Sequence, residues 1–158
     1  MRVGQGIDVH AFTPTGRVVL AGVVAAEDRG VAATSDGDVI AHAVADALVG
    51  AAALGDLGEF FPSSDPQWKD ADSMGLLATI VSRLDGLGMH AANVDVTVLA
   101  QTVRVSPLRN QMRANLAAVL RVPSEAVSVK ATTTDHLGFL GRDEGIAAIA
   151  VVMLTTRT

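Results

Sequence analysis

The stretch SDGDVIAHAVADALVGAAAL, residues 35–54, decides the fold. Its alanine-rich part, from Asp38 to about Leu54, predicts a helix that is capped by Ser35 or Asp36 and ends before Gly55. No other helix is marked as clearly in this sequence, so the remaining elements are described relative to it.

Strand and helix patterns flank this helix on both sides. Strands are expected over residues 2–10, 17–23, 94–98, 127–134 and 146–154, and helices over 73–88, capped by Ser73, and 106–120. Turn residues at 13–16 predict that the first two strands pair with each other, as a hairpin or strand pair, whereas 55–66 is irregular. The last strand is so uniformly apolar that both of its faces should be buried.

The order of these elements indicates an α+β fold, an α/β sandwich. We expect a mixed four-stranded sheet with helices packed on one face and a small β-hairpin, within a single domain spanning residues 1–158. Hydrophobic residues make up 49% of the chain, which excludes a disordered protein. No apolar run reaches the roughly 20 residues of a membrane span, so the expected location is the cytoplasm and no membrane partner is expected.

Charge and cysteine content restrict the chemistry. The net charge of -5, without a basic cluster, argues against nucleic acid as a partner, because phosphate neutralisation requires concentrated Lys and Arg. The chain has no cysteine, so disulfides and thiolate metal sites are excluded and a tightly bound transition metal must use histidine and carboxylate ligands.

Asp8, His10 and His42 form a candidate metal site. Alternate residues of a strand point to one face, so Asp8 and His10 should project together, and His42 lies on the polar stripe of the central helix. A charge on an apolar strand is costly unless something neutralises it. Two imidazoles and one carboxylate would leave one position of a tetrahedral zinc ion open, as catalytic sites do.

Several other polar residues can be interpreted as either structural or functional. Asp46, one turn beyond His42, is either a partner that orients an imidazole or a solvated helix carboxylate. Asp36 is better explained as a helix cap than as a ligand. Residues 132–135, at a strand end, combine hydroxyls with a hard oxygen ligand, which suits a phosphate group with magnesium. The Gly-x-Gly at residues 4–6 is not a dinucleotide fingerprint, because no helix opens directly after it.

Four motifs in order carry a specific resemblance: GIDVHAF at 6–12, SDGD at 35–38 with His42 and Asp46, ALGDLG at 53–58, and KATTT at 130–134 followed by GRDEG at 141–145. Together they resemble the 2-C-methyl-D-erythritol 2,4-cyclodiphosphate synthases of the non-mevalonate isoprenoid pathway. The resemblance implies a lyase that cyclises 4-diphosphocytidyl-2-C-methyl-D-erythritol 2-phosphate and releases CMP. It also implies a homotrimer whose active sites lie between subunits.

The resemblance assigns roles residue by residue. Zinc would be held by Asp8, His10 and His42, and magnesium or manganese by Asp135, while Thr34 and Thr133 would act in catalysis. The 61–65 loop would hold the erythritol part, residues 100–106 the cytidine, and Phe139, Arg142 and Glu144 would line a central cavity for isoprenoid diphosphates. The implied substrate-binding residues are Asp8, His10, Thr34, Ser35, Asp56, Leu57, Gly58, Phe61, Ser64, Asp65, Ala100, Val103, Arg104, Val105, Ser106, Thr132, Thr133, Thr134, Asp135, Phe139 and Arg142.

The chain departs from the family pattern at three places. Thr34 stands where the family usually has histidine, Asp135 replaces the commoner glutamate, and Val103-Arg104-Val105 replaces a Pro-Lys-hydrophobic stretch. Two alternatives therefore stay open. One is a zinc-dependent phosphoesterase that uses water, and the other is a non-catalytic trimer that binds an isoprenoid diphosphate. Retention of Asp135, Thr133 and Asp56 counts against the second.

Overall fold

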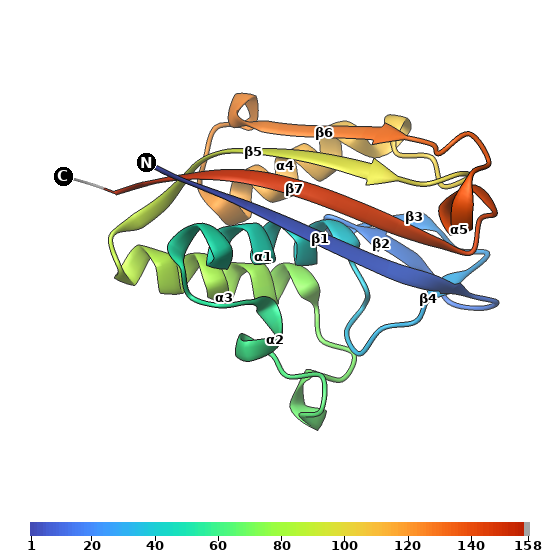
Figure 1. Cartoon of the computed structure of the whole chain (residues 1–158), viewed down its shortest axis with the longest axis horizontal. Helices are drawn as coiled ribbons and strands as arrows, with labels where there is room; N and C mark the ends of the chain where they lie inside the picture. The colour runs from blue at the N-terminus through green and yellow to red at the C-terminus, as the bar shows by residue number, and fades with distance from the viewer. Residues whose placement is uncertain (157–158) are drawn as a thin grey trace.

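The structure, a computed structural model, describes residues 1–156 as a layer of strands covered by a layer of helices (Figure 1). The strands are β1 (Arg2–Thr13), β2 (Val18–Leu20), β3 (Val23–Ala26), β4 (Gly30–Val31), β5 (Met89–Leu99), β6 (Val127–Thr132) and β7 (Gly145–Thr156). The helices are α1 (Val39–Ala52), α2 (Leu57–Phe60), α3 (Ser73–Gly86), α4 (Arg109–Leu120) and α5 (Gly138–Gly141), with 3-10 turns η1 (Pro66–Trp68), η2 (Ser106–Leu108) and η3 (Ser124–Ala126).

The main sheet is mixed, with strand order β4-β1-β7-β5-β6. β7 is antiparallel to both β1 and β5, whereas β5 and β6 are parallel and are joined through α4. α1 packs on β1 and β7, α3 packs on α1, and α4 packs on β6 and α3. The predicted α+β class is thus confirmed: four long strands form the sheet, and the two-residue β4 extends its edge.

Two glycines let α1 approach β1 closely. A Cβ atom on Gly4 would lie 1.9 Å from the carbonyl oxygen of Ala47, and one on Gly6 would lie 2.0 Å from that of Ala43. Only glycine fits at these positions, because the helix backbone occupies the space of a side chain. Asp8 and His10 lie on the same face of β1 as these glycines, so the close crossing also brings them toward the start of α1.

The hairpin forms between other segments than expected. β2 pairs with β3 across Ala21 and Gly22, which have φ values of 49° and 73°. Two consecutive positive φ angles are the geometry of a tight two-residue hairpin turn. The predicted pairing of the first two strands is therefore wrong: β1 pairs with β7 along its length and with β4 at its end.

Both N-caps differ from the prediction, that of α1 by two or three residues and that of α3 by one. The N-cap of α1 is Asp38, whose side chain accepts from the N–H groups of Ile40 and Ala41. The N-cap of α3 is Asp72, so Ser73 is the first helical residue and its side chain is free for another role. Apart from these caps, both helices lie where the hydrophobic periodicity predicts them.

The face of the sheet opposite the helices is open and apolar. Val3, Ile7, Val9 and Val151 are 70%, 56%, 45% and 42% exposed. Within one chain, β7 is fully buried on its helix-covered face, whereas its other face is buried at Gly145 and Ala147, half-buried at Ile149 and Met153 and exposed at Val151. Among residues 1–156 no helix is long and apolar enough to cross a membrane.

Candidate functional site

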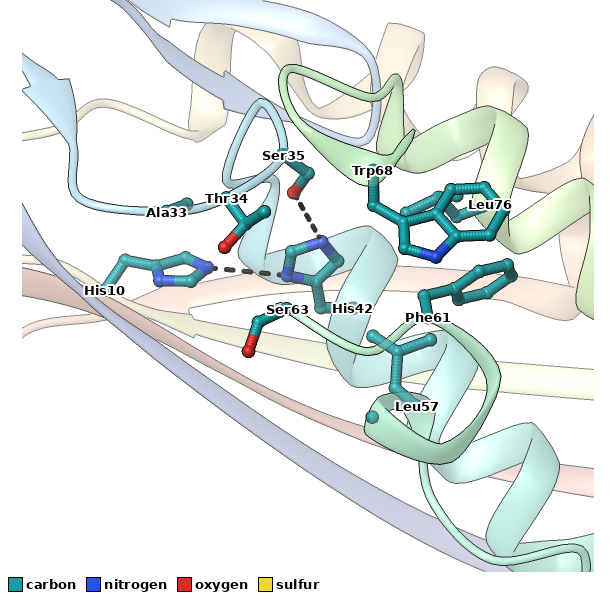
Figure 2. A pocket seen from close by; sticks show the side chains of 11 residues that line it. His10, Ala33, Thr34, Ser35, His42, Leu57, Phe61, Ser63, Trp68 and Leu76 are labelled. Carbon is teal, nitrogen blue, oxygen red and sulfur yellow. Dashed lines mark hydrogen bonds between the residues drawn. The ribbon is translucent and has the colours of Figure 1, made fainter. Parts of the chain in front are cut away.

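Asp8, His10 and His42 come together where β1 meets the first turn of α1. Asp8 Oδ2 lies 3.0 Å from His10 Nε2 and 2.9 Å from His42 Nδ1. The two ring nitrogens are 3.4 Å apart, and Figure 2 shows His10 and His42 facing each other. Among the described residues this trio offers ligand atoms that all lie within 4.8 Å of one another. The three side chains can therefore hold one metal ion, and the side chains of these residues converge as their spacing predicts.

The electrostatics of the trio suit a cation. Burial alone would raise the pKa of Asp8, but hydrogen bonds and charge from His10 and His42 lower it well below its ordinary value. Burial alone would lower the pKa of His42, yet its hydrogen bond to Asp8 and the negative charges of Asp8, Asp38 and Asp36 raise it overall. The site thus attracts positive charge, which protons supply when no metal is present.

The second ring nitrogen of His42 faces two hydroxyl groups. His42 Nε2 lies 2.9 Å from Ser73 Oγ and 3.1 Å from Ser35 Oγ. Ser73 is 1% exposed, and its hydroxyl donates to the carboxylate of Asp36, which also accepts from the Ser73 N–H at 3.3 Å. The Ser73 oxygen can then accept the Nε2 proton, which leaves the Nδ1 lone pair of His42 directed at Asp8 and His10.

Asp46 and Asp36 take other roles than those weighed from the sequence. Asp46 Oδ1 accepts a 2.8 Å hydrogen bond from the N–H of Leu57, so it holds the start of α2 rather than orienting an imidazole. Asp36 accepts from the N–H of Asp38 at 3.2 Å, but it also holds Ser73. The partner that orients His42 is therefore a serine–aspartate pair, which helical spacing along α1 does not reveal.

A cavity of about 220 Å³ opens beside the two imidazoles, between α1, α2 and the 61–76 region (Figure 2). Its wall is polar near the histidines and apolar at the far side, where the Phe61 and Trp68 rings meet edge to face at 4.9 Å. The lining residues are His10, Ala33, Thr34, Ser35, His42, Leu57, Gly58, Phe61, Ser63, Trp68 and Leu76. We refer to this space as the metal-side cavity.

A second cavity, of about 200 Å³, lies at the carboxyl ends of β5 and β6. The N–H of Ala100 donates to the carbonyl of Thr132 at 3.1 Å, which joins the segments after the two strands. The lining residues are Ala100, Gln101, Val103, Arg104, Val105, Ser106, Ala131, Thr132 and Thr133. We refer to it as the loop-side cavity, and it shares no lining residue with the metal-side cavity.

The other candidate residues from the sequence lie outside both cavities. Asp56 caps α2 and Asp65 caps η1 through their side chains, and Ser64 is exposed on the loop between them. Asp135 accepts from the hydroxyl of Thr133 at 3.1 Å in an exposed turn and does not belong to the Asp8 cluster.

Thr134 lies in the same turn, and its hydroxyl donates to the carbonyl of Leu137 at 2.7 Å. Arg142 pairs with Glu144 at 2.8 Å, and Phe139 is 47% exposed nearby on α5.

The sequence did not single out Ser73, Trp68, Leu76 or Ala33 as site residues, whereas Ser63 lies in the 61–65 loop expected to hold the erythritol part. Trp68 is the one tryptophan of the chain, and this rarity was an available signal. The sequence predicts Ser73 as a helix cap because serine is common at that position, but the preceding Asp72 is the cap.

Known proteins are similar to this chain over nearly its whole length. Residues 1–155 match the model of the YgbB family. The protein named 2-C-methyl-D-erythritol 2,4-cyclodiphosphate synthase from Moorella thermoacetica is 53% identical over 157 residues, which cover 99% of this chain and 96% of that protein. The protein of the same name from Salinibacter ruber is 53% identical and covers 95% of this chain and 96% of its own length.

Solved structures agree with these relatives. The bifunctional IspDF of Campylobacter jejuni superimposes with a TM-score of 0.95 at 40% identity, over 99% of this chain and 42% of that longer chain. IspF of Plasmodium falciparum, solved as a CDP complex, gives a TM-score of 0.87 at 29% identity over 99% of this chain and 97% of its own. This chain belongs to the YgbB family, together with relatives named 2-C-methyl-D-erythritol 2,4-cyclodiphosphate synthase.

Proposed function

We propose that this chain is a phosphorus–oxygen lyase of isoprenoid precursor synthesis. It converts 4-diphosphocytidyl-2-C-methyl-D-erythritol 2-phosphate into 2-C-methyl-D-erythritol 2,4-cyclodiphosphate and CMP. One observation carries the proposal: Asp8, His10 and His42 form a trio whose two histidines line the metal-side cavity, in a chain that is 53% identical to a synthase of that name over 157 residues.

The donor set of the trio fits zinc. Two imidazole nitrogens and one carboxylate oxygen would hold the ion, and Ser73 fixes the tautomer of His42 that ligation requires. When bound, the ion supplies Lewis-acid polarisation of a phosphate oxygen. A cation is needed because the protein carries a net charge of -5 and its substrate is an anion.

The chemistry requires no nucleophile from the protein. An oxygen of the substrate's 2-phosphate forms a bond to the β-phosphorus, the bond from that phosphorus to the oxygen it shares with the α-phosphorus breaks, and CMP leaves with the shared oxygen. Residues of the chain therefore act by positioning and by hydrogen bonding. Thr34 lines the metal-side cavity beside both imidazoles, where its hydroxyl can donate to a phosphate oxygen, and Thr133 offers the same group from the loop-side cavity.

A second cation belongs at Asp135. Its carboxylate is an exposed oxygen ligand two residues from Thr133, and such ligands suit magnesium or manganese shared with a diphosphate. Asp135 would hold the cation close to the loop-side cavity, which Thr133 lines and where the cytidine part is expected. CDP in the Plasmodium falciparum structure supports a nucleotide ligand for this fold.

A homotrimer with shared active sites accounts for two features of the single chain. The residues expected to bind one substrate fall into two cavities with no common lining residue, so a neighbouring copy would complete each site. The open apolar face around Ile7 and Val151 would be covered by the other copies. Phe139 and Arg142 remain candidates for an isoprenoid diphosphate near the trimer axis.

Product analysis tests the reaction. Zinc-loaded protein is incubated with the diphosphocytidyl substrate and magnesium, and the products are followed by phosphorus NMR. Two coupled phosphorus signals of a cyclic diphosphate together with CMP are expected. Linear products or free phosphate would establish a hydrolase instead, and unchanged substrate with a metal-bound trimer would favour the non-catalytic binding protein.

Subunit complementation tests the shared site. His42→Ala and Asp135→Ala should each be inactive alone, because one lacks a zinc ligand and the other the second cation site. When the two variants are refolded together in equal amounts, they should form trimers of random composition. About one quarter of the sites should then have both residues intact, so about one quarter of the wild-type activity should return. No recovery in verified mixed trimers would contradict a site built from two subunits.

A further inference from the structure

Three segments that are distant in sequence meet at Asp143. Arg29 lies between β3 and β4, Thr102 lies in the loop after β5, and Asp143 lies in the turn between α5 and β7. Arg29 Nη1 donates to Asp143 Oδ2 at 2.6 Å, and Thr102 Oγ1 donates to the same carboxylate at 2.9 Å. Arg29 Nη1 also donates to Thr102 Oγ1 at 3.3 Å, so the three side chains form a closed hydrogen-bonded network.

Arg29, the cation of this network, makes one further contact that holds it in place. The guanidinium of Arg29 lies 5.1 Å from the ring centroid of Phe12, in cation–π contact. The side chains of Arg29 and Asp143 are 26% and 24% exposed, so the ion pair is only partly shielded from water. The hydrogen bond from Arg29 to Asp143 raises the pKa of the guanidinium further, so it stays charged at any physiological pH.

Asp143 occupies a backbone conformation that favours glycine. Its φ angle is 59°, in the left-handed region, which glycine adopts without strain and aspartate tolerates at some cost. An aspartate is therefore not required by the turn itself. What aspartate adds at this position is the carboxylate that binds Arg29 and Thr102.

Thr102 lies near the middle of the 100–106 loop, which forms one wall of the loop-side cavity. Its neighbours Gln101 and Val103 both line that cavity. On its other side the loop borders a further hollow of about 260 Å³, lined by Ala25, Ala26, Asp28, Arg29, Thr102, Val103 and Arg104. Ala100 and Val105 anchor the two ends of the loop in the core and Val103 packs against it, whereas Thr102 is exposed and is held by its hydrogen bonds to Asp143 and Arg29.

We propose that Asp143 is a positioning residue for nucleotide binding, acting through Thr102 to hold the 100–106 loop in the shape of the loop-side cavity. The inference rests on the proposed function, in which this cavity receives the cytidine diphosphate part of the substrate. Asp143 touches no substrate itself, so its loss should weaken nucleotide binding without altering the chemical step.

Asp143→Gly is the decisive variant because glycine fits the left-handed backbone and so preserves the fold. CDP binding is measured by isothermal titration calorimetry on the zinc-loaded protein. We expect the dissociation constant to rise by about tenfold, KM to rise in parallel and kcat to stay within about twofold. Thr102→Val should give the same loss, and the double variant should lose no more than either single one, because both remove one network.

Two matched variants separate positioning from general structure. Asp143→Asn keeps an acceptor for Thr102 and tolerates positive φ, so it should recover most of the CDP affinity. Asp28→Asn removes another carboxylate that contacts Arg29, at 3.3 Å, but does not reach Thr102, and its affinity should equal that of the wild type. An Asp143→Gly protein with wild-type CDP affinity would overturn the proposal while leaving the synthase assignment intact, whereas a wild type that does not bind CDP would overturn both.

Discussion

Removal of the Ser73 hydroxyl should weaken zinc binding, although Ser73 touches no metal. In Ser73→Ala, His42 Nε2 loses the hydroxyl at 2.9 Å and keeps only that of Ser35 at 3.1 Å. Loss of a hydrogen-bond partner behind a metal ligand costs about 10- to 100-fold in metal affinity. Since Ser35 remains, we expect about tenfold for Ser73→Ala and about 100-fold when Ser35→Ala is added.

The same substitution should leave the fold intact. Asp36 still accepts from the N–H of Asp38 at 3.2 Å and from that of residue 73 at 3.3 Å, and the cap of α3 is Asp72. Loss of one buried hydrogen bond should lower the free energy of unfolding of the metal-free protein by about 1–2 kcal/mol. Thermal and urea unfolding measure this change.

Zinc affinity is measured by competition with a chromophoric chelator at neutral pH. Thr79→Ala is the matched control, because it removes a hydroxyl from the same helix that bonds only to the carbonyl of Gly75. Its zinc affinity should equal that of the wild type. A folded Ser73→Ala protein whose zinc dissociation constant stays within about twofold of wild type would refute the role assigned to Ser73.

Three further predictions follow from the site and its support. Thr34→His should raise turnover or leave it unchanged, since it adds an imidazole beside the phosphates; a large loss of kcat in a folded protein would show that the site is built around threonine. Gly6→Ala should destabilise the protein by about 2–3 kcal/mol in urea unfolding, because its methyl group would lie 2.0 Å from the Ala43 carbonyl, and wild-type stability would contradict the close packing of α1. In the metal-free protein, the raised pKa of His42 stabilises the fold. This stabilisation is fully present at pH values below the pKa of His42 in the unfolded chain, and it is lost as the pH rises through its pKa in the folded protein. The lowered pKa of Asp8 stabilises the fold as well, and that contribution is lost in acid. Urea unfolding of the wild type should therefore give a free energy of unfolding that falls as the pH rises near neutrality, whereas that of His42→Gln should not depend on pH there. Identical pH profiles for the two proteins would rule out the ion pair between His42 and Asp8.

The parts of the metal trio that depend on local spacing could be predicted from sequence, whereas their meeting depends on where α1 crosses β1. Strand alternation places Asp8 and His10 on one face, and helical spacing places His42 one turn into α1. The Gly-x-Gly at residues 4–6 was correctly excluded as a dinucleotide motif. Its actual role, close approach of α1, depends on which helix crosses the strand, and no local pattern encodes that crossing.

Features that depend on contacts between distant segments could not be predicted in this way. Ser73 reaches His42 only because α3 starts beside α1, and its position at a helix start favours a capping role. The hairpin was misplaced because the turn at Ala21 and Gly22 requires positive φ at an alanine, which is uncommon. The two separate cavities likewise appear only when strand ends and loops are placed in space.

The source of the attacking oxygen tests the central claim most directly. The reaction is run in water enriched in oxygen-18 with zinc-loaded protein, magnesium and the diphosphocytidyl substrate, and the products are analysed by mass spectrometry. Attack by the substrate's own 2-phosphate predicts cyclic diphosphate and CMP that both lack the heavy isotope. A linear phosphate product or CMP carrying one heavy oxygen would mean that water is the nucleophile, and would contradict the assignment of this chain as a cyclising lyase.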